Sequence, residues 1–278
     1  EQTRQHCMML ENAVYDRFEM AVCQMAREGL LGELVHVEGG YAHPIGDRWT
    51  AWRMEYSRLN AGDIYPTHSI GPVCRLLDIH RTDRMHYLTA MQTNAFKGAE
   101  MYQEVMGKAC DSFANGDQTS TMIRTVKGKT MLIQHNVMTP RPYSRMFQAV
   151  GTQGYAAKYP VPEVQLSSKS AVKVGIDVED SNQPLNASQI ELLLNHYAPS
   201  FPPETIALAK ELDARGGMSY FMDLRLAQCL QQGLPLDMDV YDLAEWCCIA
   251  ELSKRSIEHG SMPVMIPDFV NRRSSVDT

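Results

Sequence analysis

The sequence lacks the short motifs by which many proteins hold phosphates or metals. It contains no Gly-x-Gly-x-x-Gly and no Walker A loop, and the glycine pairs at 39–40 and 216–217 are too short to cradle a pyrophosphate. Its seven cysteines are odd in number and show no Cys-x-x-Cys or Cys/His ligand spacing. We therefore predict no disulfide framework and no metal site, and we expect reduced, buried thiols.

Long apolar runs and excess positive charge are also missing. No stretch approaches the ~20 apolar residues that cross a bilayer, so no membrane span is predicted. A net charge of −7 and a pI near 5.7 argue against a nucleic-acid partner. Because the chain begins at Glu1 without an initiator methionine, we expect a fragment of a longer protein. Its location is left open between the bacterial cytoplasm and periplasm.

The order of apolar patterns predicts strands in the middle of the chain and helices after them. Strands are expected at 6–10, 34–41, 87–93, 121–126, 130–137 and 144–150, and helices at 13–28, 70–79, 187–197, 203–213, 217–232 and 239–258. Residues 42–64 are expected to be irregular and 160–188 an exposed loop. Strands joined by short turns, such as the one at Gly128, favour antiparallel pairing. The predicted fold class is α+β, an open and mainly antiparallel sheet with helices packed on one face.

The segment from Gly62 to Pro72 has the strongest functional signal. It places Tyr65, Pro66, Thr67 and His68 between glycines and prolines, just ahead of an apolar helical run. Loops on a rigid scaffold concentrate function. A histidine near a helix N-terminus tends to be neutral, and so is able to accept or donate a proton. Taken alone, such a tetrapeptide is more often a structural turn.

Two further candidates follow predicted strands. Glu11 and Asn12 come at the end of the first strand, where ligand-facing residues of open sheets tend to lie, although Asn12 alone is better explained as a helix cap. Tyr41 follows a glycine pair at the end of the second strand, a position where tyrosines more often pack than react.

Two more candidates lie beside rings and prolines. Arg53 is next to Trp52, and it either holds sugar hydroxyls or is a solvated arginine lying over the indole. Tyr143 projects from a segment stiffened by Pro140 and Pro142, which is either a site or a rigid connection between strands.

Taken in order, these segments resemble one family. The segments are Met9–Asn12, Gly39–Tyr41, Trp52–Arg53, Tyr65–Pro72 and Arg141–Arg145, with support from Gly233–Asp242. The chain resembles the C-terminal two-thirds of an NAD-dependent glycoside hydrolase of the α-N-acetylgalactosaminidase type, glycoside hydrolase family 109. That family belongs to the Gfo/Idh/MocA oxidoreductase superfamily, and the resemblance covers almost the whole chain.

The resemblance implies two domains and a cofactor. Residues 1–30 would be the remnant of a Rossmann domain that binds NAD, and 31–278 an α+β substrate and oligomerisation domain. The implied reaction is unusual among glycosidases, most of which use paired carboxylates. NAD⁺ oxidises the sugar 3-hydroxyl, a base removes the C2 proton, the glycosidic oxygen leaves, water adds, and the ketone is reduced again. As a fragment the chain would be inactive, and a homo-oligomer through the sheet is implied.

The resemblance also implies roles for individual residues, at the positions that match the family's motifs. Tyr41 and His68 would be catalytic, as the C2 base and the group that manages the 3-hydroxyl proton. Glu11, Asn12 and Tyr65 would contact NAD. The implied sugar-binding residues are Tyr41, Arg53, Tyr65, Pro66, Thr67, His68 and Tyr143. A tyrosine normally titrates near ~10, so Tyr41 would need a cationic or hydrogen-bonding neighbour to act as a base.

Two departures from the family pattern keep the substrate open. The chain reads Arg215-Gly216-Gly217-Met218-Ser219 where the family has His-Gly-Gly-Met-Asp, and its segment 42–52 is shorter. The alternatives are a sugar dehydrogenase of the same superfamily and a non-catalytic module for sugar binding or oligomerisation. Net NADH formation from a free sugar would distinguish the dehydrogenase.

Overall fold

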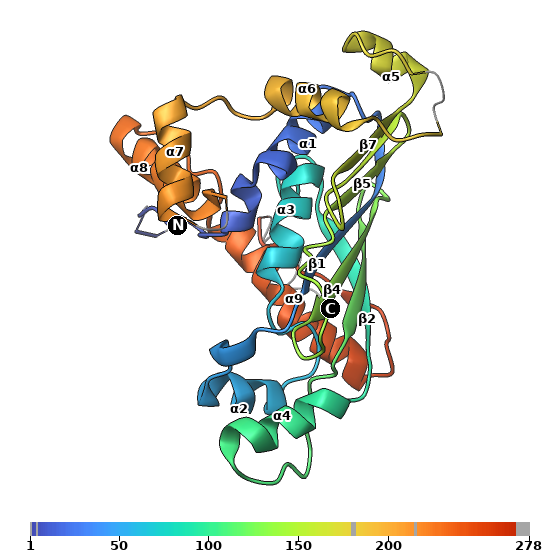
Figure 1. Cartoon of the computed structure of the whole chain (residues 1–278). Coiled ribbons are helices and arrows are strands. Elements are labelled where there is room, and N and C mark those ends of the chain that lie inside the picture. Colours follow the sequence, from blue (N-terminus) through green and yellow to red (C-terminus); the bar gives the residue numbers. More distant parts are fainter. Residues whose placement is uncertain (1, 4, 179–181, 214–215, 271–278) are drawn as a thin grey trace.

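One eight-stranded sheet organises the molecule in the computed structural model, which describes residues 2–3, 5–178, 182–213 and 216–270 (Figure 1). The spatial order is β7-β6-β5-β1-β4-β3-β2-β8. The strands are β1 Leu34–Ala42, β2 Met85–Gln92, β3 Thr119–Thr125, β4 Thr130–Asn136, β5 Gln148–Gly151, β6 Gly154–Ala157, β7 Glu163–Leu166 and β8 Val264–Met265. Neighbouring strands are antiparallel except for β1 and β4, which pair in parallel. The predicted open, mainly antiparallel sheet is confirmed.

Helices cover one face of this sheet, and others extend beyond its end. The α-helices are α1 Arg17–Arg27, α2 Ala51–Leu59, α3 Thr67–Leu77, α4 Phe96–Met106, α5 Ser168–Lys173, α6 Ala187–Tyr197, α7 Pro203–Leu212, α8 Met218–Gln232 and α9 Val240–Glu258. Two 3-10 helices are η1 Asn12–Tyr15 and η2 Gly46–Arg48. α3 lies against β1 and α9 against β2, while α2 and α4 form a separate pair near one end of the sheet (Figure 1). No described helix is long and apolar enough to cross a membrane.

The main core lies between the sheet and α1, α3 and α9. The strands alternate, so that Val37, Ile123 and Ile133 point inward and are fully buried. Helix α1 adds Phe18 and Met25, which are buried in the same cluster. This packing fixes the C-terminal end of β1 against the first turn of α3.

Three of the predicted segments are wrong. Residues 6–10 form no strand, and the described sheet ends at β7 and β8, so no neighbour pairs with them. The segment predicted to be irregular, 42–64, contains α2. The sequence does not indicate this helix because Trp52 and Tyr56 are exposed, so its large apolar residues do not follow the spacing of a buried helix face. The expected loop 160–188 contains β7 and α5, and Ser167 caps α5 by accepting from the Ser170 amide.

Two smaller corrections concern α3 and the thiols. α3 begins at Thr67, so His68 lies inside its first turn and does not precede it. All seven cysteines are free, but Cys7 and Cys247 are exposed, contrary to the expectation of buried thiols.

Candidate active site

Aromatic side chains from three segments meet beyond the end of β1. The Tyr41 ring lies 4.8 Å from the His68 ring and 5.5 Å from the Tyr65 ring, measured between centroids. His43 stands 4.8 Å from Tyr41 on its other side and 5.0 Å from Tyr143. The structure therefore brings together Tyr41, Tyr65, His68 and Tyr143, and it adds His43, which the sequence analysis missed.

A glycine on β1 allows this approach. A Cβ added at Gly39 would lie 2.0 Å from the carbonyl oxygen of Ser69, so only glycine lets α3 come this close to β1. Pro66 occupies the position before the first residue of α3. His68 is consequently held in the first turn of a helix that packs directly on the strand carrying Tyr41.

Glu11 orients the imidazole of His68. The Glu11 carboxylate is 1% exposed, and its Oε1 lies 2.6 Å from Nδ1 of His68. The same oxygen accepts a hydrogen bond of 3.0 Å from the Ala13 amide, which caps η1. Because a carboxylate oxygen accepts, Nδ1 carries the proton, and Nε2 is left as the nitrogen available to a ligand.

A cavity of about 610 Å³ opens at this cluster. Its wall includes Asn12, Tyr41, His43, His68 and Tyr143. The Asn12 amide nitrogen donates to the Ser219 hydroxyl at 3.0 Å, so the side chain does not cap the following helix. Caps are supplied by Glu11 for η1 and by Asp16 for α1.

His43 offers an unused acceptor to this cavity. Its Nδ1 lies 3.0 Å from the Pro44 carbonyl oxygen and therefore carries the proton. Its Nε2 is buried and has no hydrogen-bond partner among the described residues. Burial lowers the pKa of His43, so the ring is neutral and Nε2 is an acceptor. Buried polar atoms normally have a hydrogen-bond partner, so this unpaired nitrogen makes His43 a candidate to bind a ligand hydroxyl.

Arg145 connects Tyr143 to a buried charge network. Its guanidinium donates to the Tyr143 hydroxyl at 3.0 Å and to Glu19 Oε1 at 2.6 Å. It also donates to Asp16 Oδ2 at 3.1 Å, and Lys158 pairs with the same carboxylate. Burial raises the pKa of Glu19 to about 7 despite the adjacent guanidinium. Burial also opposes ionisation of Asp16, but Lys158 and Arg145 outweigh it and lower the pKa of that carboxyl.

Comparison with known proteins decides the family. The family model described as "Glycosyl hydrolase 109, C-terminal domain" matches residues 45–275. The chain is 50% identical over 279 residues to "Glycosyl hydrolase family 109 protein 1" of Bacteroides fragilis (strain YCH46), covering 97% of this chain and 60% of that protein. It is 51% identical over 281 residues to the protein of the same name from Bacteroides thetaiotaomicron, covering 97% and 59%. The chain belongs to glycosyl hydrolase family 109.

Solved structures share the fold. One titled "Levoglucosan dehydrogenase, complex with NADH and levoglucosan" aligns with a TM-score of 0.60 at 15% identity, over 92% of this chain and 65% of that one. The chain therefore shares its fold with this sugar dehydrogenase, and the predicted α+β fold class is confirmed. The chain spans about 60% of the length of its curated family 109 relatives.

Not every residue carried over from the family 109 pattern lies in the first cavity. Arg53 and Tyr65 line a second cavity of about 310 Å³, which adjoins the first at Tyr41. Pro66 and Thr67 line neither of these two cavities in the described part of the chain. Within the divergent Arg215–Ser219 motif, Arg215 lies outside the described residues, whereas Ser219 holds Asn12.

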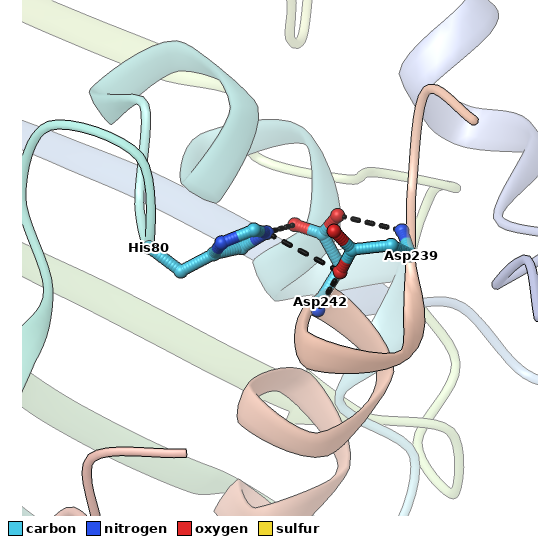
Figure 2. A group of neighbouring side chains, drawn as sticks. All are labelled: His80, Asp239 and Asp242. Atoms are coloured by element: carbon cyan, nitrogen blue, oxygen red, sulfur yellow. Dashed lines mark hydrogen bonds and ion pairs between the residues drawn. The ribbon is translucent and has the colours of Figure 1, made fainter. Parts of the chain in front are cut away.

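One cluster outside this candidate site has side chains of the metal-ligand type. Figure 2 shows the side chains of His80, Asp239 and Asp242 turned toward one another. Their possible ligand atoms all lie within 4.8 Å of one another. Both carboxylates already cap α9, because Asp239 accepts from the Tyr241 and Asp242 amides and Asp242 from the Asp239 amide. Arg81 also donates to Asp242 at 3.0 Å. These bonds account for both carboxylates, so we interpret the cluster as a charged helix cap.

Proposed function

We propose that the complete protein is an NAD-dependent glycoside hydrolase acting on N-acetylgalactosaminide-like sugars. The observation that carries the proposal is the contact of Tyr41 with a His68 ring that Glu11 orients, at the wall of a cavity large enough for a sugar. Family membership supports the same reading. The groups that meet there are tyrosine and histidine, whereas most glycosidases use two carboxylates.

The cofactor would lie beside Asn12 and His68. NAD, when bound, would supply reversible oxidation of the sugar 3-hydroxyl. The hydrogen bond to Ser219 fixes the Asn12 amide on the cavity wall, while the buried Glu11 reaches the cavity only through His68. The unpartnered His43 Nε2 and the Asn12 amide fit a polar ligand. We also propose that residues 1–30 belong to a dinucleotide-binding domain and 31–278 to the substrate domain.

Each protein group would have one proton to move. His68 would take the 3-hydroxyl proton on Nε2, because Glu11 keeps Nδ1 protonated. Tyr41 would take the C2 proton as a phenolate. The imidazolium that His68 becomes by taking the 3-hydroxyl proton would favour this form, because the centroids of the two rings lie 4.8 Å apart. Tyr143 would donate to the leaving oxygen, since its own oxygen already accepts from Arg145 and its proton is directed elsewhere.

Substrate binding would extend to the residues around this centre. Tyr65 lies against both Tyr41 and His68, and Arg53 would contact substrate from the second cavity. Pro66 and Thr67 would act by fixing the start of α3 and hence the place of His68.

The test uses the full-length protein with p-nitrophenyl α-N-acetylgalactosaminide, following nitrophenol and NADH together. We expect nitrophenol without accumulating NADH, and loss of turnover in Tyr41→Phe. If no glycoside is cleaved but free sugars yield NADH, the protein is a sugar dehydrogenase, a function that the levoglucosan dehydrogenase fold neighbour favours. If neither reaction occurs, a non-catalytic sugar-binding module remains.

We further propose a homo-oligomer through the open face of the sheet. On this face Met91 and Met122 are 66% and 40% exposed, and Leu132 pairs with Met122 across the strands. Exposed apolar surface of this kind marks interaction sites. Light scattering should show a smaller particle for Met122→Glu than for the unaltered protein; equal sizes would reject this interface.

A further inference from the structure

The second cavity adjoins the first. Its volume is about 310 Å³, and it shares Tyr41, Ile45 and Arg48 with the cavity that contains His68. The two cavities share the Tyr41 side chain as a wall, and a ligand in the first cavity that extends past this side chain would reach the second. This geometry suits a substrate with two linked parts.

Aromatic rings from two segments form the outer wall of this second cavity. Trp52 and Tyr56 stand four residues apart on α2 and so on one side of the helix. They are 63% and 45% exposed, and Tyr65, which lines the same cavity, is 47% exposed. Large rings left exposed around a concavity are typical of ligand sites. Flat apolar rings suit the apolar face of a pyranose.

Polar atoms in the inner wall have no partner. The indole nitrogen of Trp49 and the hydroxyl of Ser57 are buried and unbonded within the described residues, and both residues line this cavity. His135, also in the wall, is 2% exposed, and burial lowers its pKa to about 4, so it is neutral. A few polar groups among aromatic walls are what fix the orientation of a ligand rich in hydroxyls.

Arg53 holds the outer aromatic wall in place. Its guanidinium lies 4.9 Å from the centroid of the Trp52 ring, and it donates to the Arg48 carbonyl at 3.0 Å. The indole is thereby tied to the segment between the two cavities. An exposed tryptophan held in this way is a preorganised platform for a ligand.

From these observations we propose that the second cavity binds the sugar ring on the leaving side of the glycosidic bond. The ring stacks on Trp52 and Tyr56, and its hydroxyls face Trp49, Ser57 and His135. This inference rests on the proposed function, because the sugar that is oxidised must occupy the first cavity. It makes the natural substrate an oligosaccharide, with a second pyranose in place of a small aglycone.

Direct binding is tested first, on the full-length protein labelled with ¹⁵N at tryptophan and carrying Tyr41→Phe, so that the probe is not cleaved. Three of its tryptophans lie in this chain. An α-linked N-acetylgalactosaminyl-galactose disaccharide is the probe. We expect the indole signals of Trp49 and Trp52 to shift, while the signal of the fully buried Trp246 stays unchanged. Leu59→Ala, an exposed position on α2 that does not line the cavity, should leave the titration unaltered. Absence of any shift at Trp49 and Trp52 would overturn the proposal.

Turnover by the full-length protein then separates the subsite from the chemistry. Trp52→Ala should lower kcat/KM about tenfold for the disaccharide and leave methyl α-N-acetylgalactosaminide unchanged. If both substrates are cleaved and the substitution affects them equally, the subsite is rejected and the hydrolase stands. If neither glycoside is cleaved by the unaltered protein, the proposed function itself fails.

Discussion

The guanidinium of Arg145 donates to the hydroxyl oxygen of Tyr143 across 3.0 Å. Arg145 is 3% exposed and is neutralised by Glu19 and Asp16, so it is a fixed part of the scaffold. A hydroxyl that accepts from a buried cation directs its own proton away from it. In the proposed function, Tyr143 would therefore donate its proton toward the cavity that it lines.

Tyr143→Phe tests this arrangement. It removes the donor and leaves the Arg145 network in place, so the melting temperature should change little. General acid catalysis contributes about 10²–10⁴-fold. We expect a loss of that order in kcat/KM for a methyl glycoside and a smaller loss for a nitrophenyl glycoside, whose leaving group needs little protonation.

The control for that experiment is Tyr155→Phe on the open face of the sheet, where the hydroxyl contacts Gln148. Activity of this variant should match that of the unaltered protein. Equal losses for the two glycosides in Tyr143→Phe would show that the residue is not the acid.

Glu11→Gln tests the orientation of His68. The substitution keeps the shape of the side chain and an oxygen that can cap η1 through the Ala13 amide. It removes the charge that fixes Nδ1 of His68 as the donor. For metal-bound histidines, loss of the partner that orients the ring typically costs about 10–100-fold. We expect a fall of that size in kcat with KM nearly unchanged. Steady-state kinetics on the exposed Glu33→Gln variant provide the matched control, and an unaltered kcat in Glu11→Gln would contradict the role.

The amino-acid sequence predicts part of this site because the necessary signal is local. Gly39 and Gly40 precede Tyr41 in one strand, and the segment ending at His68 precedes a helix, so strand-end geometry alone places them at one edge. The hydrogen bond between Arg145 and Glu19 joins residues 126 positions apart, so no local sequence pattern predicts it. Which cavity Arg53 faces is equally a result of tertiary packing.

The fold shows the same division. The hairpin of β3 and β4 follows from alternation around a glycine turn, and α6 to α9 from their apolar spacing. α2 escapes prediction because its large apolar residues face outward, and the sequence analysis gives no prediction for α4. The parallel pairing of β1 with β4 requires two strands almost a hundred residues apart to meet, which sequence periodicity does not encode.

The buried Asp63 leads to a prediction about how the stability of the protein depends on pH. It is fully buried below the Tyr65 loop, and Oδ2 has no partner among the described residues. Burial raises its pKa to about 7, although the Tyr65 amide donates to it. The folded state therefore binds this proton more tightly than the unfolded state, and stability is lost as the pH rises from about 4 to about 7. Asp63→Asn removes that loss.

Urea unfolding at pH 5 and pH 8 measures the effect. The free energy of unfolding of Asp63→Asn, minus that of the unaltered protein, should be larger at pH 8 than at pH 5. Each pKa unit corresponds to about 1.4 kcal/mol, and pH 5 lies about two units below the folded pKa of about 7, so the gain is at most about 3 kcal/mol. Asp111→Asn, at an exposed position, should show no such gain. The same difference in stability at both pH values would refute the prediction.

The last prediction concerns His80, which lies at the N-terminus of α9. Its Nε2 lies 3.3 Å from Asp242 Oδ1 and 3.5 Å from Asp239 Oδ1 (Figure 2). The hydrogen bond to Asp242 raises the pKa of His80, and the Asp242 and Asp239 charges add to this effect. For a histidine whose folded pKa is raised, the stabilisation is complete below the unfolded pKa of about 6.5 and disappears as the pH rises through the folded value. His80→Gln should therefore melt about 2–4 °C lower at pH 5.5 and at nearly the same temperature at pH 8.5. His6→Gln, at an exposed position, serves as the control. If His80→Gln lowers the melting temperature equally at both pH values, His80 contributes packing and not charge.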